Sequence, residues 1–218
     1  MRGIVLAAFA MLGLLAAAPP AGEQNRATPG TVRVRIVTSE GSIVLALDSR
    51  RAPRTTTNFM TYVDDGRLDG TRFYRAARRT GNPQLGFVQG GIGTDATRML
   101  DRLPLESTDQ TGLRHLDGTV SMARGIDPSS GNANFSIMVG ANPGLDARGA
   151  NRGYAAFGRV VAGMDVVKRI LARPSGGGSG AMRGQMLLQP VRILRAERID
   201  GTPHPSGRPK VWLLRPQR

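Results

Sequence analysis

Arg75 and Gln89 are the two polar side chains whose surroundings in the sequence point to chemistry. They belong to the stretch 71–91, TRFYRAARRTGNPQLGFVQGG. An aromatic pair at 73–74 precedes the arginine, a turn-rich Gly-Asn-Pro segment follows it, and a short strand predicted over 86–89 ends at the glutamine. A fixed cation and a neutral amide are therefore expected on neighbouring strands with apolar residues between them. This arrangement suits holding a peptide carbonyl and packing an apolar ring, and it supplies no nucleophile.

Charge and composition limit the classes of protein. The 218 residues suffice for one domain of ordinary size, and the net charge of +14 comes almost entirely from arginine. An anionic partner such as nucleic acid or a membrane surface is one interpretation. The arginines are scattered and no nucleic-acid motif is present, so we favour a solvated basic surface and expect no nucleic-acid partner. The absence of cysteine excludes disulfides, thiolate metal sites and a cysteine nucleophile.

The N-terminus has the layout of a secretory signal peptide. Arg2 is followed by an apolar and small-residue run over 4–18, and residues 1–22 end in small residues and prolines. The run is shorter than the roughly 20 residues that span a bilayer. We therefore expect a periplasmic or otherwise exported protein with no stable membrane span; an uncleaved anchor is the alternative. Residues 23–31 are polar and are expected to form a mobile leader.

The remaining chain is patterned as short strands with two brief helices. Apolar and polar residues alternate in many short runs, and Pro53 stands where a helix can begin. This predicts an all-β, mainly antiparallel domain over residues 32–200, with strands at 32–36, 43–47, 73–74, 86–89, 119–123, 134–139, 154–161 and 186–199 and helices from Pro53 to about 64 and over 164–171.

Three segments are expected to interrupt or extend this domain. Residues 174–180, PSGGGSG, have the composition of a flexible surface loop. Pro190 suggests an edge or a bulge in the last strand. Residues 201–218 form a basic, proline-rich tail with the single tryptophan, Trp212. That residue either docks on the body of the domain, which we favour, or contacts a partner.

Several ordered motifs resemble those of the cyclophilins, the peptidyl-prolyl cis–trans isomerases. The resemblance extends from about 32 to 199. Its pieces are Ala52-Pro53 with Asn58-Phe59, Phe73-Tyr74-Arg75, Gln89-Gly90-Gly91, the run 118–123, Asn134-Phe135, and the run 157–160 with Gly163-Met164-Asp165.

The resemblance implies a fold, a reaction and partners. It implies a closed, mainly antiparallel eight-stranded barrel with a helix at each end. Because such a barrel is filled with side chains, the ligand groove is expected on its outer surface. It also implies an isomerase that needs no cofactor and no metal. The expected protein is a monomer that acts on unfolded or flexible proline-containing polypeptides.

The resemblance also assigns residues to the site. Arg75 and Gln89 fall at the catalytic positions. Seven further positions contact substrate: two line the proline slot, three hold peptide backbone, one stands where histidine or tyrosine is usual, and one faces the slot floor. In that order they are Phe87 and Leu145; Ala123, Arg124 and Asn134; Tyr154; and Ser136.

The chain departs from the family pattern at three places. Ser136 replaces an aromatic residue, which removes on the order of 1–3 kcal/mol of apolar contact from the slot. Asn134 replaces a longer glutamine. Thirteen residues separate Arg75 from Gln89, more than usual, and a phenylalanine expected near Leu85 or Gly86 is missing. Binding of cyclosporin-type inhibitors is therefore expected to be weak.

Two functional hypotheses follow. The first, which we favour, is an exported prolyl isomerase in which Arg75 polarises the X–Pro bond and Gln89 orients the arginine and holds the peptide. The second is a cyclophilin-like module that binds peptides without useful turnover. A hydrolase is set aside because no nucleophile–His–acid set is evident. His115 is expected to be structural because the sequence shows no partner for it.

Overall fold

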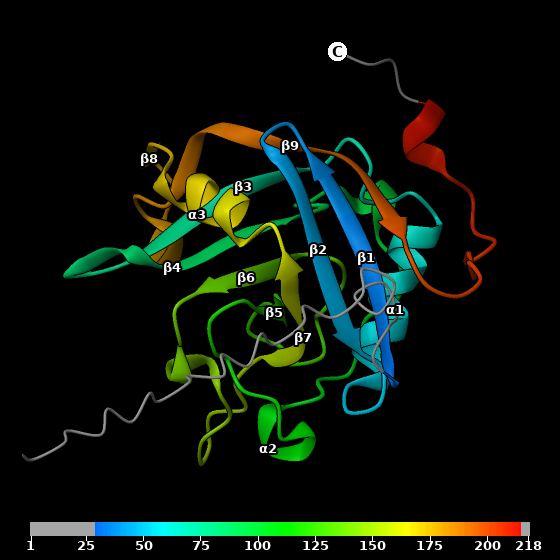
Figure 1. Cartoon of the computed structure of the whole chain (residues 1–218), viewed down its shortest axis with the longest axis horizontal. Helices are drawn as coiled ribbons and strands as arrows, with labels where there is room; N and C mark the ends of the chain where they lie inside the picture. Colours follow the sequence, from blue (N-terminus) through cyan, green and yellow to red (C-terminus); the bar gives the residue numbers. More distant parts are fainter. Residues whose placement is uncertain (1–28, 215–218) are drawn as a thin grey trace, which may run out of the picture.

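Eight strands close into an antiparallel barrel in the computed structural model, which describes residues 29–214 (Figure 1). Neighbouring strands follow the order β1-β2-β7-β5-β6-β4-β3-β9, and pairing of β9 with β1 completes the circle. A two-residue strand, β8, pairs only with β9. The strands are β1 (Thr31–Thr38), β2 (Gly41–Asp48), β3 (Arg72–Arg79), β4 (Asn82–Gly91), β5 (Thr119–Met122), β6 (Phe135–Val139), β7 (Ala155–Ala162), β8 (Ser175–Gly176) and β9 (Met186–Arg198).

Two helices lie at opposite ends of this barrel (Figure 1). They are α1 (Pro53–Asp64) and α3 (Met164–Ala172); a single turn, α2 (Thr108–Thr111), lies in the loop before β5. Pro53 opens α1 as predicted. Its residue at the N-cap position, Ala52, offers no side-chain acceptor, and Glu106 from the distant loop accepts the backbone N–H groups of Arg54 and Thr55 at 3.0 and 2.7 Å instead. The start of the helix is thus capped by a tertiary contact.

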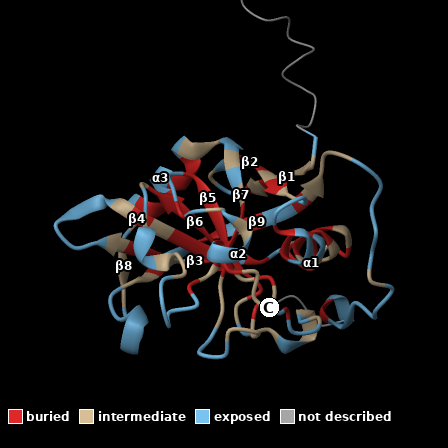
Figure 2. Ribbon diagram, turned by 90° about the horizontal axis from the view of Figure 1, so that it is seen from below, coloured by how far each residue is buried: buried red, intermediate tan, exposed pale blue. Residues whose placement is uncertain are grey.

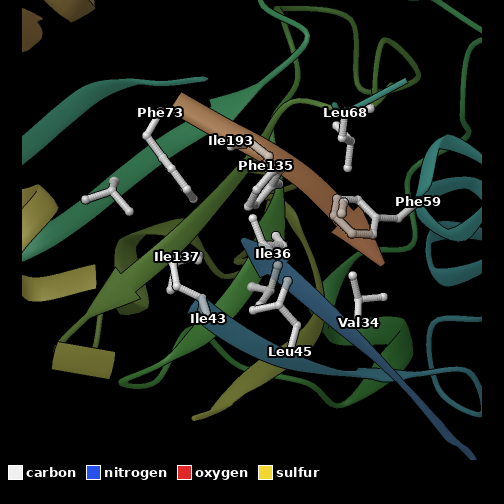
Figure 3. Close-up of a cluster of buried hydrophobic side chains, with 14 of the residues drawn as sticks. Val34, Ile36, Ile43, Leu45, Phe59, Leu68, Phe73, Phe135, Ile137 and Ile193 are labelled. Carbon is white, nitrogen blue, oxygen red and sulfur yellow. The ribbon is translucent and has the colours of Figure 1, made fainter. Parts of the chain in front are cut away.

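Inward-facing residues of the strands fill the barrel (Figure 3). In β6, Phe135 and Ile137 point inward while Ser136 between them points outward, as the two-residue period of a strand requires. The ring of Phe135 contacts Phe59 and Phe73 at centroid distances of 5.2 and 5.6 Å. Figure 2 shows the buried residues concentrated on the strands. The interior is closed to ligands, so a binding site has to lie outside.

Two strands differ from, or add detail to, the local predictions. The aromatic strand at 73–74 is longer than predicted: β3 and β4 form one extended hairpin that reaches Arg79 and Asn82. Pro190 does lie at an irregularity, because the pairing of β9 with β3 jumps from Val191 to Met186.

The flexible loop predicted for 174–180 is wrong in part. Ser175 and Gly176 form β8, and a 3-10 turn, η4 (Gly180–Met182), follows. A β-carbon on Gly178 would lie 2.4 Å from the carbonyl oxygen of Met182, so this glycine permits a close turn.

The C-terminal segment docks on the barrel end that carries α1. Trp212, in the 3-10 turn η5 (Val211–Leu214), is 7% exposed. The guanidinium groups of Arg67 and Arg98 lie 4.7 and 5.2 Å from its ring. The sequence left open whether Trp212 docks on the domain or contacts a partner, and in the structure it docks on the domain.

The predicted signal peptide lies outside the described residues, as does most of the predicted leader. Within residues 29–214, no helix is long and apolar enough to cross a membrane.

Candidate functional site

The guanidinium of Arg75 is held on the outer surface of the barrel by neutral groups. Arg75 lies in β3, where its register partners are Gln89 of β4 on one side and Met186 of β9 on the other. Its Nη1 donates to Oε1 of Gln89 at 2.9 Å, and its Nε donates to Oε1 of Gln185 at 2.8 Å. Its Nη2 donates to the carbonyl oxygen of Ala181 at 3.2 Å. No described carboxylate forms an ion pair with Arg75, so its charge is not neutralised.

The Arg75 guanidinium is partly shielded from water. The ring of Phe87 lies 5.0 Å from the guanidinium. Burial lowers the pKa of Arg75 from its ordinary value, and interactions with the hydroxyls of Tyr74 and Tyr154 offset part of this effect. An arginine stays protonated at physiological pH in spite of such a shift. Its field is stronger here than it would be in bulk water, because fewer water dipoles screen it.

Gln89 connects Arg75 to Tyr74. Its Oε1 accepts from the arginine, and its Nε2 donates to the tyrosine hydroxyl oxygen at 3.0 Å. Burial raises the pKa of Tyr74 to about 12, against the lowering effects of the Gln89 hydrogen bond and of Arg75. The phenol is therefore neutral at physiological pH and does not compensate the charge of Arg75. Gln89 thus holds the Arg75 guanidinium through one hydrogen bond, and its orienting role in catalysis stays a prediction.

A groove of about 1100 Å³ lies beside this network. It contains four of the residues that the sequence assigned to the site, together with Tyr74 and two methionines, Met182 and Met186, that the sequence did not suggest. The four predicted residues are Gln89, Ala123, Arg124 and Asn134. The lining therefore includes side chains that carry amide and guanidinium groups.

Two of the predicted backbone-binding side chains already have partners. Asn134 donates to the carbonyl oxygen of Gly93 at 2.8 Å and accepts from the Gly93 N–H at 2.7 Å. Arg124 donates to the carbonyl oxygen of Gly153 at 2.9 Å and stacks on the ring of Tyr154 at 4.7 Å. Asn134 thus fixes the rim of the groove, and a peptide would have to compete for its amide.

The predicted slot residues, like Arg75 itself, lie next to the groove and do not line it. Phe87 packs under Arg75, and the N–H of Tyr154 donates to the carbonyl oxygen of Leu145 at 3.0 Å. Ser136 pairs in register with Gln89 and with Ser121 and is 7% exposed. It faces outward as expected and leaves this position without a ring.

His115 has partners that the sequence did not reveal. Its Nδ1 lies 2.6 Å from Oδ1 of Asp146, and its Nε2 lies 2.8 Å from Oγ of Ser121. The expectation that no nucleophile–His–acid set exists was therefore wrong as a statement about geometry. His115 and Ser121 are only 1% and 2% exposed, however, and neither lines the groove. A substrate carbonyl cannot reach this serine, so the three residues do not indicate a hydrolase. Their hydrogen bonds instead connect the loop that contains Asp146 to β5.

The buried imidazole predicts a pH-dependent stability. Burial lowers the pKa of His115 below its ordinary value of 6.5, and Asp146 opposes part of that shift. Below pH 6.5 the unfolded chain therefore takes up a proton that the folded chain still excludes. Stability falls as the pH drops towards the folded pKa, by at most roughly 1.4 kcal/mol per pH unit.

Urea unfolding of the wild type and of His115→Gln between pH 5 and pH 8 checks this prediction. The variant should lack this component, so the stability difference between the two proteins should shrink on acidification. A difference that stays constant over the range would contradict a neutral buried His115.

A second groove, of about 840 Å³, lies on the outer face of β1, β2 and β7. Five arginines that are scattered in the sequence line it: Arg33, Arg50, Arg51, Arg114 and Arg159. Two of these are paired, Arg33 with Asp200 and Arg51 with Asp48. The two grooves share no residue, and only the first contains predicted site residues. Among the described residues, no group of three or more histidine or acidic side chains could hold a metal ion.

Comparisons with known proteins agree with the fold. Residues 33–198 match the model of the cyclophilin-type peptidyl-prolyl cis-trans isomerase family. Peptidyl-prolyl cis-trans isomerase A of Dickeya dadantii is 37% identical over 166 residues, which are 76% of this chain and 83% of that protein. The isomerase cyp18 of Streptomyces antibioticus is 38% identical over 170 residues, 75% of this chain and 96% of the other.

A crystal structure of a cyclophilin-type isomerase from Cryptosporidium parvum shares the fold. Its TM-score is 0.60 at 20% identity, and the match covers 79% of this chain and 99% of that one. A second structure of that protein, in the presence of the dipeptide Ala-Pro, has a TM-score of 0.58.

The barrel, its outer groove and these matches define a cyclophilin-like enzyme. The chain belongs to the cyclophilin-type peptidyl-prolyl cis–trans isomerase family.

Proposed function

We propose that this enzyme isomerises X–Pro bonds of exported polypeptides and that Arg75 supplies the electrostatic part of catalysis. The uncatalysed reaction takes tens to hundreds of seconds because the amide C–N bond has partial double-bond character. Rotation breaks this resonance, and the proline nitrogen becomes pyramidal and electron-rich. A guanidinium that donates a hydrogen bond to this nitrogen stabilises the transition state more than the planar ground state.

One observation carries this mechanism: in the described part of the chain, only neutral acceptors hold the Arg75 guanidinium. Each of its five N–H groups is a donor, and three acceptors are present in the structure. Two N–H groups remain, one on Nη1 and one on Nη2, for a peptide. Because no carboxylate within residues 29–214 balances the charge, the guanidinium can respond to negative charge that develops on the substrate.

A peptide-binding module without turnover is the second candidate. It is favoured by Ser136, which offers no aromatic surface at the slot, and by Asn134, whose amide is engaged with Gly93. Both features weaken contacts with substrate, whereas the charged group on which the chemistry rests is retained. We therefore favour the enzyme.

Exchange NMR spectroscopy of an Ala-Pro peptide distinguishes the two candidates without a coupling protease. The enzyme should broaden and exchange the cis and trans resonances at a few per cent of the peptide concentration. Peptide-induced shifts in the protein without exchange between the two isomers would leave the binding module and contradict catalysis.

The proposed site of action rests on residues 1–22. Their basic start and apolar run are those of an export signal. Fusing residues 1–31 to alkaline phosphatase tests this, because that reporter gains its disulfides only in an oxidising compartment.

We expect phosphatase activity from this fusion in a bacterial host. We expect at least a tenfold loss when Leu14→Arg and Leu15→Arg interrupt the apolar run. Equal activity of the two fusions, or none from either, would contradict export through this segment.

A further inference from the structure

The segment 177–185 lies against the same guanidinium that the proposed mechanism uses. Its sequence, GGSGAMRGQ, has the composition of a linker, yet it forms a defined turn. The N–H of Gly184 donates to the carbonyl oxygen of Gly177, and the hydroxyl of Ser175 donates to the carbonyl oxygen of Gly184 at 3.0 Å. The backbone N–H of Ala76 donates to the carbonyl oxygen of Gln185 at 2.9 Å. The two ends of the segment are therefore tied to each other, and its C-terminal end is also tied to β8 and β3.

The segment contacts one whole edge of the Arg75 guanidinium. Nε donates to Oε1 of Gln185 at 2.8 Å, and Nη2 donates to the carbonyl oxygen of Ala181 at 3.2 Å. Gln89 holds the other terminal nitrogen from β4 at 2.9 Å. A planar group held at three nitrogens from two directions cannot rotate about its own axis. The stack on Phe87 adds a further contact to its face.

We propose that Gln185 is a positioning residue for Arg75, and that the turn 177–185 holds this side chain in the orientation that catalysis requires. The inference rests on the proposed role of Arg75. A glutamine suits the position because its amide oxygen accepts a hydrogen bond and carries no charge. A carboxylate in the same place would hold the guanidinium as well but would neutralise it.

The same turn also borders the groove. Met182, within the turn, and Met186, directly after it, line the wall that contains Gln89 and Arg124. Methionine side chains adapt to irregular apolar partners. The segment 177–185 therefore contacts both the groove in which the substrate is proposed to bind and the Arg75 guanidinium that is proposed to act on the substrate.

The test compares Gln185→Ala with Gln189→Ala. Gln189 lies four residues further along the chain, in β9, and is exposed, so it controls for a glutamine-to-alanine change in this region. The contact between Ala76 and residue 185 uses backbone atoms only and survives the substitution. We expect Gln185→Ala to lower kcat about tenfold with less than a twofold change in KM, because an arginine free to rotate seldom adopts the reactive orientation. Gln189→Ala should match the wild type.

A double-mutant cycle separates positioning from a structural effect. If Gln185 acts through Arg75, adding Gln185→Ala to Arg75→Ala should cause no further loss. Equal additional losses in both backgrounds would overturn the proposal. A rise in kcat/KM of the single variant would also overturn it, since the turn would then compete with substrate for the arginine.

A spectroscopic readout makes the test independent of turnover. The Nε–Hε resonance of Arg75 should be sharp and protected from solvent exchange in the wild type, and it should broaden in Gln185→Ala. If the wild type proves inactive, the proposed function fails while this signal still decides the positioning. An unchanged Nε–Hε resonance would contradict it.

Discussion

Replacing Arg75 with alanine is expected to lower kcat/KM for an Ala-Pro peptide by about a hundredfold. Removing one preorganised donor to developing charge typically has this size of effect in enzymes. The guanidinium is partly buried, unpaired with any described carboxylate and fixed by three hydrogen bonds, so its loss removes an oriented charge. The measurement is exchange NMR of the peptide with equal amounts of each protein.

Arg75→Lys sharpens this prediction. A lysine keeps the positive charge but is a point charge on a flexible stem, and it cannot make the three directed contacts of the guanidinium fork. We expect it to recover only a small part of the lost rate.

Arg54→Ala provides the matched control for these variants. Arg54 is exposed on α1, and its side chain forms no hydrogen bond or ion pair with the described residues, so the wild-type rate should be kept. Full activity of Arg75→Ala would refute the mechanism.

Replacing Asp65 with asparagine is expected to destabilise the fold by roughly 3–5 kcal/mol. Arg67 is 2% exposed and donates through Nε to Asp65 at 2.6 Å; Asp65 is 1% exposed. The carboxylate also accepts from the N–H of Ser206 at 2.8 Å and from its hydroxyl. Burial acts to raise the pKa of Asp65, but these hydrogen bonds outweigh it and the pKa is lowered, so the group is ionised at neutral pH. Neutralising it would leave the arginine buried without a counter-charge.

Denaturant unfolding checks this prediction against a matched pair. Asp165→Asn breaks an exposed pair with Arg169 on α3 and should change stability little. Combining Asp65→Asn with Arg67→Met should recover much of the loss, because replacing a whole buried ion pair by apolar groups is often neutral. A small effect of Asp65→Asn alone would contradict the need for a counter-charge beside the buried Arg67.

The same cluster explains how the C-terminal tail is held. Arg67 connects Asp65 to Trp212, and its Nη1 donates to the carbonyl oxygen of Arg98 at 3.2 Å. Its Nη2 is the single buried side-chain nitrogen or oxygen without a hydrogen-bond partner in the described residues. The positive charge of Arg67 is instead stabilised by the Asp65 carboxylate and by the face of the Trp212 ring.

Some of these features follow from the sequence because they are local. Alternation along a strand specifies which face is buried, so Phe135 inward and Ser136 outward were predictable from their positions alone. Pro53 fixes the start of a helix through its own ring. The spacing of Arg75 and Gln89 around one turn was enough to predict that they would be neighbours on adjacent strands, and they pair in register.

Other features depend on contacts between distant segments. Glu106 caps α1, Asp146 and Ser121 enclose His115, and Ser206 and Trp212 complete the cluster around Arg67. No periodicity marks such pairs, because each forms only when two remote segments are packed together.

The segment 174–180 shows the limit most clearly. Its glycines would make an isolated chain flexible. In the folded protein, the pairing of β8 with β9 and the backbone hydrogen bond between Ala76 and Gln185 restrict this flexibility. The sequence by itself thus determined the barrel strands, the first helix and the Arg75–Gln89 pair, since these rest on short-range geometry. Only the tertiary structure decided which neighbours hold Arg75, because Gln185 lies 110 residues away and reaches it through the closure of the barrel.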